Sequence, residues 1–273
     1  MSNTKILAVD LDDTLFADDK SVCEKNVDAL NKMLDEGHVL AIDTGRPSHV
    51  IAKLLSPYPV FSRKNVYFLS FQGSNGYDAF EKKSLFGSYL DNDAAIELLN
   101  WIKDAGLCAI AFEEGAIYCF GEDSNVEGYR RVAQEEVNVI KSAEELIGRN
   151  LVKIMAVNFD DHKALHDFED AHLEQTNKYF NSMFSNVAFL EYVPKDSSKG
   201  HGLLKLADYL SVPHSNTVAC GDERNDISMV TMAGVGCAVV NGRKELKEQA
   251  NYITTLDNNQ GAVAEVIEKF ILN

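Results

Sequence analysis

The sequence predicts an α/β protein: a doubly wound parallel-sheet core, Rossmann-like in type, with an α+β domain inserted into it. Apolar strand patterns alternate with helix patterns at both ends of the 273-residue chain, which is typical of a parallel sheet. Between these ends, hairpin patterns are mixed with helices, which indicates a separate α+β unit. We therefore expect a core formed by residues 1–78 and 194–273, and an inserted domain formed by residues 79–193.

The first part of the core is expected to contain three strands and two helices. Residues 6–9 form a short apolar run, as in a strand that is buried on both faces. Ser21 and Glu24 match a capping box, so we expect a helix over roughly 21–36. The later elements are a strand at 39–42, a helix near 48–55 and a strand at 66–69. Strands separated by helices predict right-handed crossovers and parallel pairing.

The remaining elements follow from the same patterns of apolar residues. In the inserted domain we expect a helix near 93–104, a hairpin of strands 107–112 and 116–120, a helix around 127–136, a strand at 151–158, a helix at 161–180 and a strand at 187–193. In the second part of the core we expect helices at 200–210, 225–233, 243–249 and 261–271, and strands at 217–220, 236–240 and 252–254.

Composition limits the classes of partner. The net charge of −16 argues against a nucleic acid or an anionic membrane, because both require a basic surface. No apolar run approaches the ~18 residues of a membrane-spanning helix. The five cysteines contain no CxxC pair, which favours buried free thiols in a reducing compartment. We also find no secretory signal, so we expect a soluble cytoplasmic protein that acts on a small molecule.

The first strand is followed by acidic residues. Asp10 comes directly after it, at the end of the sheet where α/β proteins bind ligands. Asp10 and Asp12 are two residues apart, so their side chains would point the same way in an extended chain. Mg²⁺ would relieve the repulsion between two such carboxylates, and an Asp can attack phosphorus. The alternative is an acidic turn without any chemical role.

Polar residues recur where other core strands end. Thr44 follows the second strand, Asp222 follows the strand at 217–220, and Lys199 opens a helix. Each residue alone has a simpler interpretation, such as a turn hydroxyl, a surface lysine or a capping Asp. Together they repeat one arrangement, a polar group at the end of a buried strand, which indicates a common site.

These segments resemble the motifs of a known family. Residues 10–15 match the pattern DxDxT, residues 44–46 read Thr-Gly-Arg, residues 199–200 read Lys-Gly, and residues 221–226 match GDxxND. In order and spacing the chain is similar to haloacid dehalogenase-like (HAD) phosphatases of the Cof type. In that resemblance, residues 79–193 correspond to a class II cap domain that sets substrate specificity.

The resemblance implies a catalytic centre. Asp10 would be the nucleophile that accepts the phosphoryl group, and Asp12 would protonate the leaving group and then activate water. Mg²⁺ would be held by Asp10, the carbonyl of Asp12 and Asp222. Thr44 and Lys199 would complete the catalytic set.

The resemblance also implies a phosphoryl-binding set: Thr44, Lys199, Asn225 and the N–H groups of Leu11 and Gly45.

Four further residues are expected at the edge of the site. Asp226 would orient Lys199 or a metal-bound water, and Glu223 would lie just outside the metal ligands. Arg46 is expected to face the cleft and contact substrate. The family pattern has Asn-Gly after the third strand, whereas this chain has Gln72 in place of the Asn. Since Gln keeps the amide, we expect altered contacts toward the cap and intact chemistry.

The sequence thus predicts a Mg²⁺-dependent phosphatase that acts through an aspartyl-phosphate. A sugar phosphate is the first expectation for its substrate, and a phosphorylated cofactor is the second. One alternative is a hexose phosphomutase or phosphotransferase; with a mutase, isomerised sugar phosphate would appear in place of free phosphate. Another is a phosphorylatable sensor without turnover, because response regulators also combine acidic residues with Thr and Lys on a doubly wound sheet.

Overall fold

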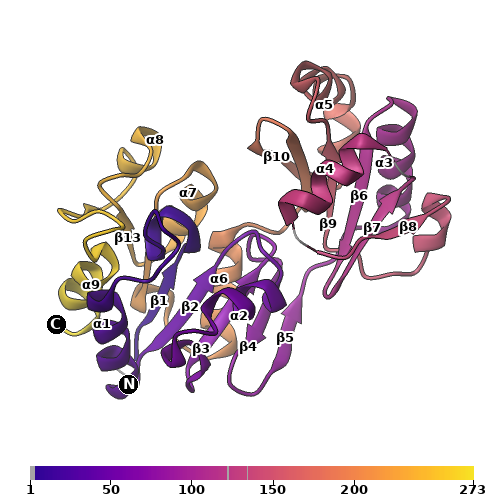
Figure 1. The fold of residues 1–273 in the computed structure, drawn as a ribbon. Coiled ribbons are helices and arrows are strands. Elements are labelled where there is room, and N and C mark those ends of the chain that lie inside the picture. The colour runs from indigo at the N-terminus through magenta and orange to yellow at the C-terminus, as the bar shows by residue number, and fades with distance from the viewer. Residues whose placement is uncertain (1–3, 122, 134) are drawn as a thin grey trace. The chain divides into compact units, whose positions relative to one another are not determined.

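The computed structural model describes residues 4–121, 123–133 and 135–273, and it divides the chain into two compact units (Figure 1). The core unit comprises the residues up to Gly87 together with Ser198–Asn273, and the inserted unit is Ser88–Ser197. The predicted boundaries at 78/79 and 193/194 are therefore too early. The first is displaced because two additional strands, β4 (Asn75–Asp78) and β5 (Lys83–Gly87), extend the core sheet to residue 87.

The core sheet has eight strands in the order β14-β13-β12-β1-β2-β3-β4-β5. Their bounds are β1 Ile6–Val9, β2 Val39–Asp43, β3 Val66–Ser70, β4 Asn75–Asp78, β5 Lys83–Gly87, β12 Thr217–Gly221, β13 Val235–Ala238 and β14 Tyr252–Ile253. The strands from β14 to β3 are parallel, as predicted, and only β4 and β5 pair antiparallel. This order places β12 directly beside β1, although the inserted unit separates them in sequence.

Helices cover both faces of the core sheet, which confirms the doubly wound prediction. The helices are α1 Glu24–Asp35, α2 Ser48–Leu55, α6 Lys199–Tyr209, α7 Ile227–Met232, α8 Lys244–Lys247 and α9 Ala262–Val266. Leu7 and Val9 of β1 pack in one apolar cluster with residues of α1, α2 and α9. Ile6 and Ala8 point to the opposite face and pack with α6, α7 and α8. Alternate residues of one strand thus hold two helix layers.

The first helix begins later than the capping box predicts. Its N-cap is Cys23, without a side-chain hydrogen bond, and the N–H of Ser21 donates to Asp19 instead. Val22 forms an isolated antiparallel bridge with Phe16. This bridge keeps the chain extended at the position where the capping box would start a helix.

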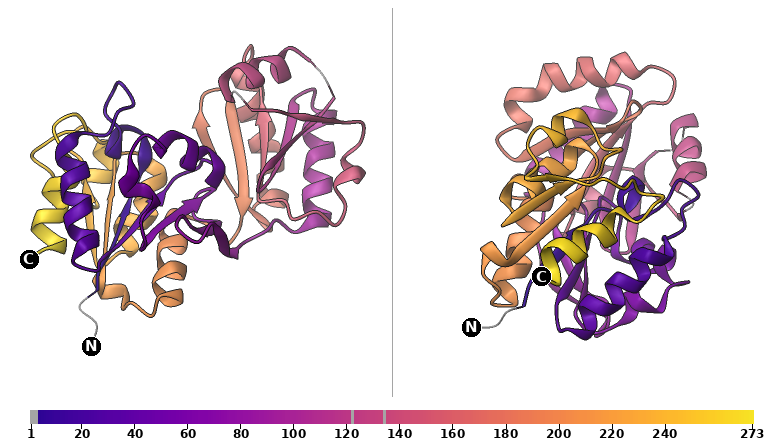
Figure 2. Two further views of the ribbon diagram at one scale, coloured as in Figure 1. Left: turned by 60° about the horizontal axis from the view of Figure 1, so that its bottom comes forward. Right: turned by 90° about the vertical axis from the view of Figure 1, so that its left-hand side faces the viewer.

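The start of the first core strand lies close to the C-terminal residues of the core (Figure 2). The Nζ of Lys5 donates to the carbonyls of Phe270, Ile271 and Asn273 at 2.7, 3.1 and 2.9 Å. These carbonyls belong to the C-terminal turn Ile267–Ile271 and the residues around its end, so a positive charge caps the last helical segment.

The inserted unit contains a six-stranded sheet in the order β10-β11-β9-β6-β7-β8. Its strands are β6 Cys108–Glu113, β7 Ala116–Phe120, β8 Asn138–Ile140, β9 Lys153–Val157, β10 Phe180–Asn186 and β11 Phe189–Pro194. Its helices are α3 Asn92–Asp104, α4 Ser124–Ala133 and α5 His162–Thr176. All pairs are antiparallel except β7–β8, which gives the α+β unit that the sequence predicts.

Two predicted helices of this unit differ from the structure. The helix predicted at 161–180 ends at Thr176, because Phe180–Asn186 pairs with β11 as a strand. Phe180 and Phe184 lie four positions apart, and so on one face of that strand, and pack in the same apolar cluster. The helix predicted around 127–136 begins earlier, at Ser124, and position 134 lies outside the described residues.

Two observations relate to the expectations from composition. All five cysteines are free thiols, and all except Cys23 are buried. Within the described part of the chain, no helix has the length and apolar character needed to span a membrane.

Candidate active site

Asp10 stands at the carboxyl end of β1. Its N–H donates to the carbonyl of Cys220 at 3.0 Å, which continues the pairing of β1 with β12 up to this residue. Only 7% of Asp10 is exposed. Burial raises the pKa of Asp10 well above its usual value, although the ammonium of Lys199 opposes this shift. The predicted nucleophile therefore lies in a buried position that disfavours its negative charge.

Lys199 supplies the cation of this cluster. Its Nζ donates to Oδ1 of Asp10 and, at 2.5 Å, to Oδ1 of Asp226, and the Lys199 side chain is fully buried. Burial opposes the positive charge, but the Asp10, Asp226 and Asp43 carboxylates outweigh it and raise the pKa of Lys199 above its usual value. The lysine is therefore charged and held between carboxylates.

Close backbone packing brings Lys199 to this position. Lys199 is the first residue of α6, and the hydroxyl of Ser198 caps the helix by accepting from the N–H of His201 at 3.2 Å. A Cβ on Gly73 would lie 2.4 Å from the carbonyl oxygen of Ser198, and one on Gly202 would lie 2.5 Å from the Cα of Gly73. Glycine at both positions lets the helix start pack against the loop after β3.

Asp226 organises the loop after β12. Its Oδ2 accepts from the N–H groups of Asp222 and Glu223, each at 2.9 Å, while its Oδ1 binds Lys199. A Cβ on Gly221 would lie 2.5 Å from the Asp226 side chain, so only glycine fits there. Asp226 thus fixes both the loop and the ammonium. Glu223 points elsewhere, because its carboxylate accepts from Arg243 at 2.9 Å.

Asp10, Asp222 and Asp226 form a candidate metal site. One carboxylate oxygen from each lies within 4.8 Å of the others. The hydroxyl of Thr14 donates to Oδ1 of Asp222 at 2.8 Å. Burial and the neighbouring Asp226 raise the pKa of Asp222 to about 7. Carboxylate oxygens held this close together are the donor set that a hard divalent cation favours, so these residues fit Mg²⁺.

Asp12 forms ion pairs with two basic residues. Its carboxylate accepts from Nε and Nη2 of Arg46 at 2.9–3.1 Å and from Lys20 at 3.2 Å. The segment Leu11–Leu15 is a tight turn in which Asp12 (φ −79°, ψ 134°) and Asp13 (φ 56°) depart from helical geometry, so it is not the extended strand that the spacing argument assumed. Arg46, which was expected to face substrate, is therefore paired with the predicted general acid. Asp12 lies outside the three-carboxylate cluster.

Leu11 follows Asp10 in the turn after β1, and the other predicted residues, Thr44, Gly45, Gln72 and Asn225, lie on three adjoining loops. Thr44 is buried, and its N–H donates to the carbonyl of Leu69 at 3.0 Å, where β2 pairs with β3. Gln72 accepts from Nδ2 of Asn225 at 3.1 Å, and its side chain fills the space that a Cβ on Gly45 would need. The loops after β2, β3 and β12 therefore meet at these residues.

Asp43 is a candidate residue that sequence reasoning missed. It is the last residue of β2 and has no exposed surface, and neither carboxylate oxygen has a hydrogen-bond partner among the described residues. Burial raises its pKa well above the usual value, while Lys199 opposes the shift. Alternation along β2 places it on the face of Ala41, toward α6. A charged residue directly after the apolar run 39–42 was the available signal.

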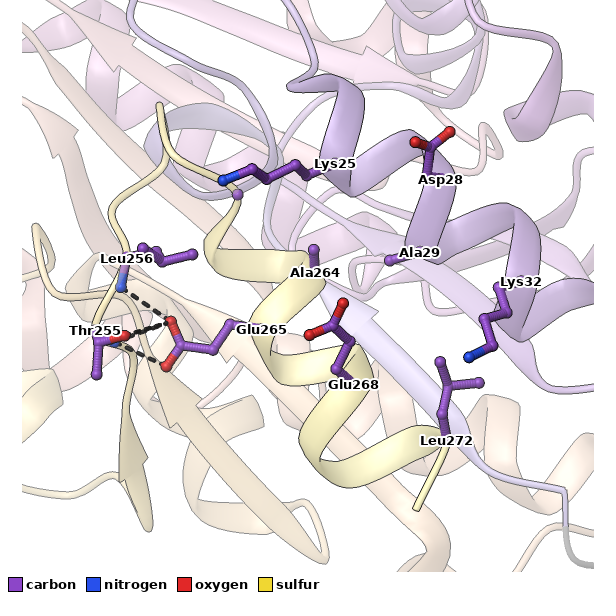
Figure 3. Close-up of a pocket in the computed structure, with 11 residues that line it drawn as sticks. Lys25, Asp28, Ala29, Lys32, Thr255, Leu256, Ala264, Glu265, Glu268 and Leu272 are labelled. Atoms are coloured by element: carbon purple, nitrogen blue, oxygen red, sulfur yellow. Dashed lines mark hydrogen bonds between the residues drawn. The ribbon is translucent and has the colours of Figure 1, made fainter.

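A separate pocket of about 560 Å³ lies between α1 and α9 in the core unit (Figure 3). Lys25, Asp28 and Lys32 line it from α1. The carboxylate of Glu265 on α9 accepts from the N–H groups of Thr255 and Leu256. None of the predicted site residues lines this pocket, so it is distinct from the carboxylate cluster.

Comparisons with known proteins agree on one family. A model of the haloacid dehalogenase-like hydrolases matches residues 7–267. A protein of Streptococcus pyogenes serotype M6 is 28% identical over 276 residues, covering 98% of this chain and 99% of its own length. The 5-amino-6-(5-phospho-D-ribitylamino)uracil phosphatase YitU of Bacillus subtilis is 25% identical, with 97% of each chain covered. The crystal structure of a haloacid dehalogenase-like hydrolase from Bacteroides thetaiotaomicron superposes with a TM-score of 0.84 at 25% identity, covering 97% of this chain and 99% of that one.

Proposed function

The chain belongs to the haloacid dehalogenase-like hydrolase family, and from that premise we propose that it is a Mg²⁺-dependent phosphomonoesterase for a small phosphorylated metabolite. Its full-length relatives include proteins named as phosphatases. The observation that carries the proposal is the buried Lys199, which contacts Asp10 and Asp226 beside the carboxylate of Asp222. A structural role alone would not require so many buried charges, because burying them costs stability.

In the proposed reaction, a carboxylate oxygen of Asp10 attacks phosphorus and the bond from phosphorus to the alkoxide breaks. Asp12 gives its proton to the departing alkoxide, so the alcohol leaves neutral. Asp12 then takes a proton from water, whose oxygen attacks the phosphorus of the aspartyl-phosphate. The second step releases inorganic phosphate and restores the Asp10 carboxylate.

For this reaction the ion pair between Asp12 and Arg46 must loosen, because Arg46 donates to both carboxylate oxygens of Asp12 and the leaving group needs one of them. Both side chains are partly exposed, at 35% and 41%, so water screens their pairing and its cost is low.

The carboxylates of Asp10 and Asp222, with the carbonyl of Asp12, would hold the metal. A bound Mg²⁺ supplies positive charge that reduces the repulsion between a carboxylate and a phosphate dianion. Thr44, Lys199, Asn225 and the N–H groups of Leu11 and Gly45 would bind the phosphoryl oxygens. Asp226 would keep Lys199 in position, and Glu223 would support the loop through Arg243.

For the substrate, we propose a sugar phosphate first and a phosphorylated cofactor second. The Bacillus subtilis relative is named for a substrate that carries a phosphorylated ribityl chain, which supports a polyhydroxylated leaving group. We assign substrate selection to the inserted unit. The free cysteines fit a reducing compartment such as the cytoplasm.

The test is phosphate release from a panel of sugar phosphates, nucleotides and phosphorylated cofactors, with Mg²⁺ and with EDTA. We expect release from a few compounds, only with Mg²⁺. The Asp10→Asn variant should lose at least about 10³-fold in kcat, because its amide cannot form the phosphoryl ester, while circular dichroism stays unchanged. Full activity in that variant would refute the mechanism, and isomerised sugar phosphate without free phosphate would indicate a mutase.

A further inference from the structure

The loop after β3 holds an unusual backbone conformation. Phe71, Gln72 and Gly73 have φ values of 51°, 59° and 78°, so three successive residues are left-handed and two of them carry a Cβ. This region is disfavoured for residues other than glycine. Such conformations persist where surrounding contacts enforce them, and they cluster at functional sites.

Contacts from two sides enforce this conformation. The N–H of Phe71 donates to the carbonyl of Arg46 at 3.3 Å, and the N–H of Gln72 donates to the carbonyl of Thr44 at 3.1 Å. On the other side, Gly73 packs against the carbonyl of Ser198 at the start of α6. The backbone of Gln72 is therefore fixed between the loop after β2 and the helix that carries Lys199.

The side chain of Gln72 joins two phosphoryl-binding loops. It is 5% exposed, and its Oε1 accepts from Nδ2 of Asn225 at 3.1 Å. Its Nε2 lies only 2.8 Å from where a Cβ on Gly45 would be. Among the residues that the structure describes, neither this Nε2 nor the N–H of Gly45 has an acceptor. Two neighbouring donors are thus unused on the rim of the site.

We propose that Gln72 is a phosphoryl-binding residue. Its Nε2, together with the N–H of Gly45, donates to one non-bridging oxygen of the substrate phosphoryl group. Its Oε1 at the same time fixes the amide of Asn225, which binds a second oxygen. The inference rests on the proposed function and extends it, because it gives the Gln that replaces the family's Asn a direct contact with substrate.

Side-chain length explains why glutamine suits this position. The strained backbone anchors Cα beside Gly73, and the amide must reach Asn225 from one side and Gly45 from the other. Asparagine tolerates the left-handed region better, but it is one carbon shorter. We therefore expect Gln72→Asn to relieve backbone strain and to lose at least one of the two contacts.

The experiment measures the affinity for inorganic phosphate by calorimetry with saturating Mg²⁺, and KM for p-nitrophenyl phosphate. Gln72→Met keeps the side-chain length without the amide. We expect a Kd for phosphate and a KM raised about 10-fold or more, as for loss of a hydrogen bond to a charged group. The matched control is Gln249→Met, which removes an exposed amide that bonds only to the carbonyl of Glu245 and should change neither value.

A second comparison separates a direct contact from an effect through Asn225. In an Asn225→Ala background, Gln72→Met should weaken phosphate binding several-fold further. If it adds nothing there, Gln72 acts only through Asn225 and the direct contact is refuted. Gln72→Asn provides a variant expected to fold at least as well as wild type, and it too should bind phosphate more weakly. Wild-type affinity in both Gln72 variants would overturn the inference.

Failure of this inference is distinguishable from failure of the proposed function. If the wild-type protein releases no phosphate from p-nitrophenyl phosphate or any panel compound, the proposed function fails, and the inference fails with it. If the wild-type protein is active with Mg²⁺ and the Gln72 variants match it, only the inference fails.

Discussion

Replacing Lys199 with methionine tests whether this lysine holds the carboxylate cluster together. Its Nζ contacts Asp10 and Asp226, and the Lys199 side chain is fully buried. Methionine is also unbranched and of similar length, so the packing of α6 against its neighbours should change little. The variant leaves Asp10 and Asp226 facing each other without a cation, and Asp43 loses the charge that opposes its own burial.

Removing one partner of a buried ion pair costs about 3–5 kcal/mol, because the other charge stays buried and uncompensated. That is a large share of the ~5–15 kcal/mol that stabilises a typical domain. Protonation offers partial relief, since burial already raises the pKa of Asp10 and of Asp43. We therefore expect a loss of about 3–5 kcal/mol at pH 8 and a clearly smaller loss at pH 5.5.

The assay is urea unfolding followed by circular dichroism, in EDTA, at both pH values. Lys244→Met is the matched control, because that lysine side chain is 85% exposed and its ion pair with Glu248 spans 3.6 Å. The control should stay within about 0.5 kcal/mol of wild type. A loss below about 1 kcal/mol for Lys199→Met at pH 8, or a loss that grows as the pH falls, would refute this reasoning.

Two further predictions concern the metal site and the loop after β3. The pKa of Asp222 is raised to about 7. Between pH ~4 and 7 the folded metal-free protein therefore binds more protons at Asp222 than the unfolded chain does. The contribution of Asp222 to the free energy of unfolding falls as the pH rises through this range. In EDTA, Asp222→Asn should reduce the change in the urea midpoint between pH 5.5 and 7.5. A change as large as in wild type would contradict the raised pKa of Asp222. Gly73→Ala and Gly106→Ala both place a Cβ at a residue with positive φ, which costs about 1–2 kcal/mol of stability in each variant. Of these two added Cβ atoms, only the one at residue 73 would also clash with a carbonyl oxygen, that of Ser198 at 2.4 Å. Gly73→Ala should therefore cost at least ~2 kcal/mol more in urea unfolding, and equal costs would show that the close approach is unimportant.

The core strands were predictable because a parallel strand buried on both faces is a continuous apolar run that ends in polar residues. The strand Ile6–Val9 has the predicted bounds for this reason. The helix Ser48–Leu55 also has its predicted bounds. Strands β8 and β10 were not predicted. Asn138–Ile140 is short, and Phe180–Asn186 contains four polar residues, so neither has an apolar pattern of its own. Pairing with β7 and β11 makes them strands.

Candidate site residues could be recognised because their motifs are local. A carboxylate at the end of a buried strand is visible in the sequence, and so is a lysine at a helix start. The partners of these groups were only partly predictable. Arg46 was expected to contact substrate, yet it binds Asp12, and the buried Asp43 was missed. Both depend on how loops from different strands meet, which no short stretch of sequence records.

The sequence by itself determined the class of core, the presence of an inserted domain and the motif residues, because periodicity and turn chemistry act within a few residues. Only the tertiary structure decided which charges meet. It places β12 beside β1, which brings Asp222 next to Asp10, and it buries Lys199 between Asp10 and Asp226. Burial and Coulomb interactions depend on distance in space, so segments remote in the chain set the charge state of this site.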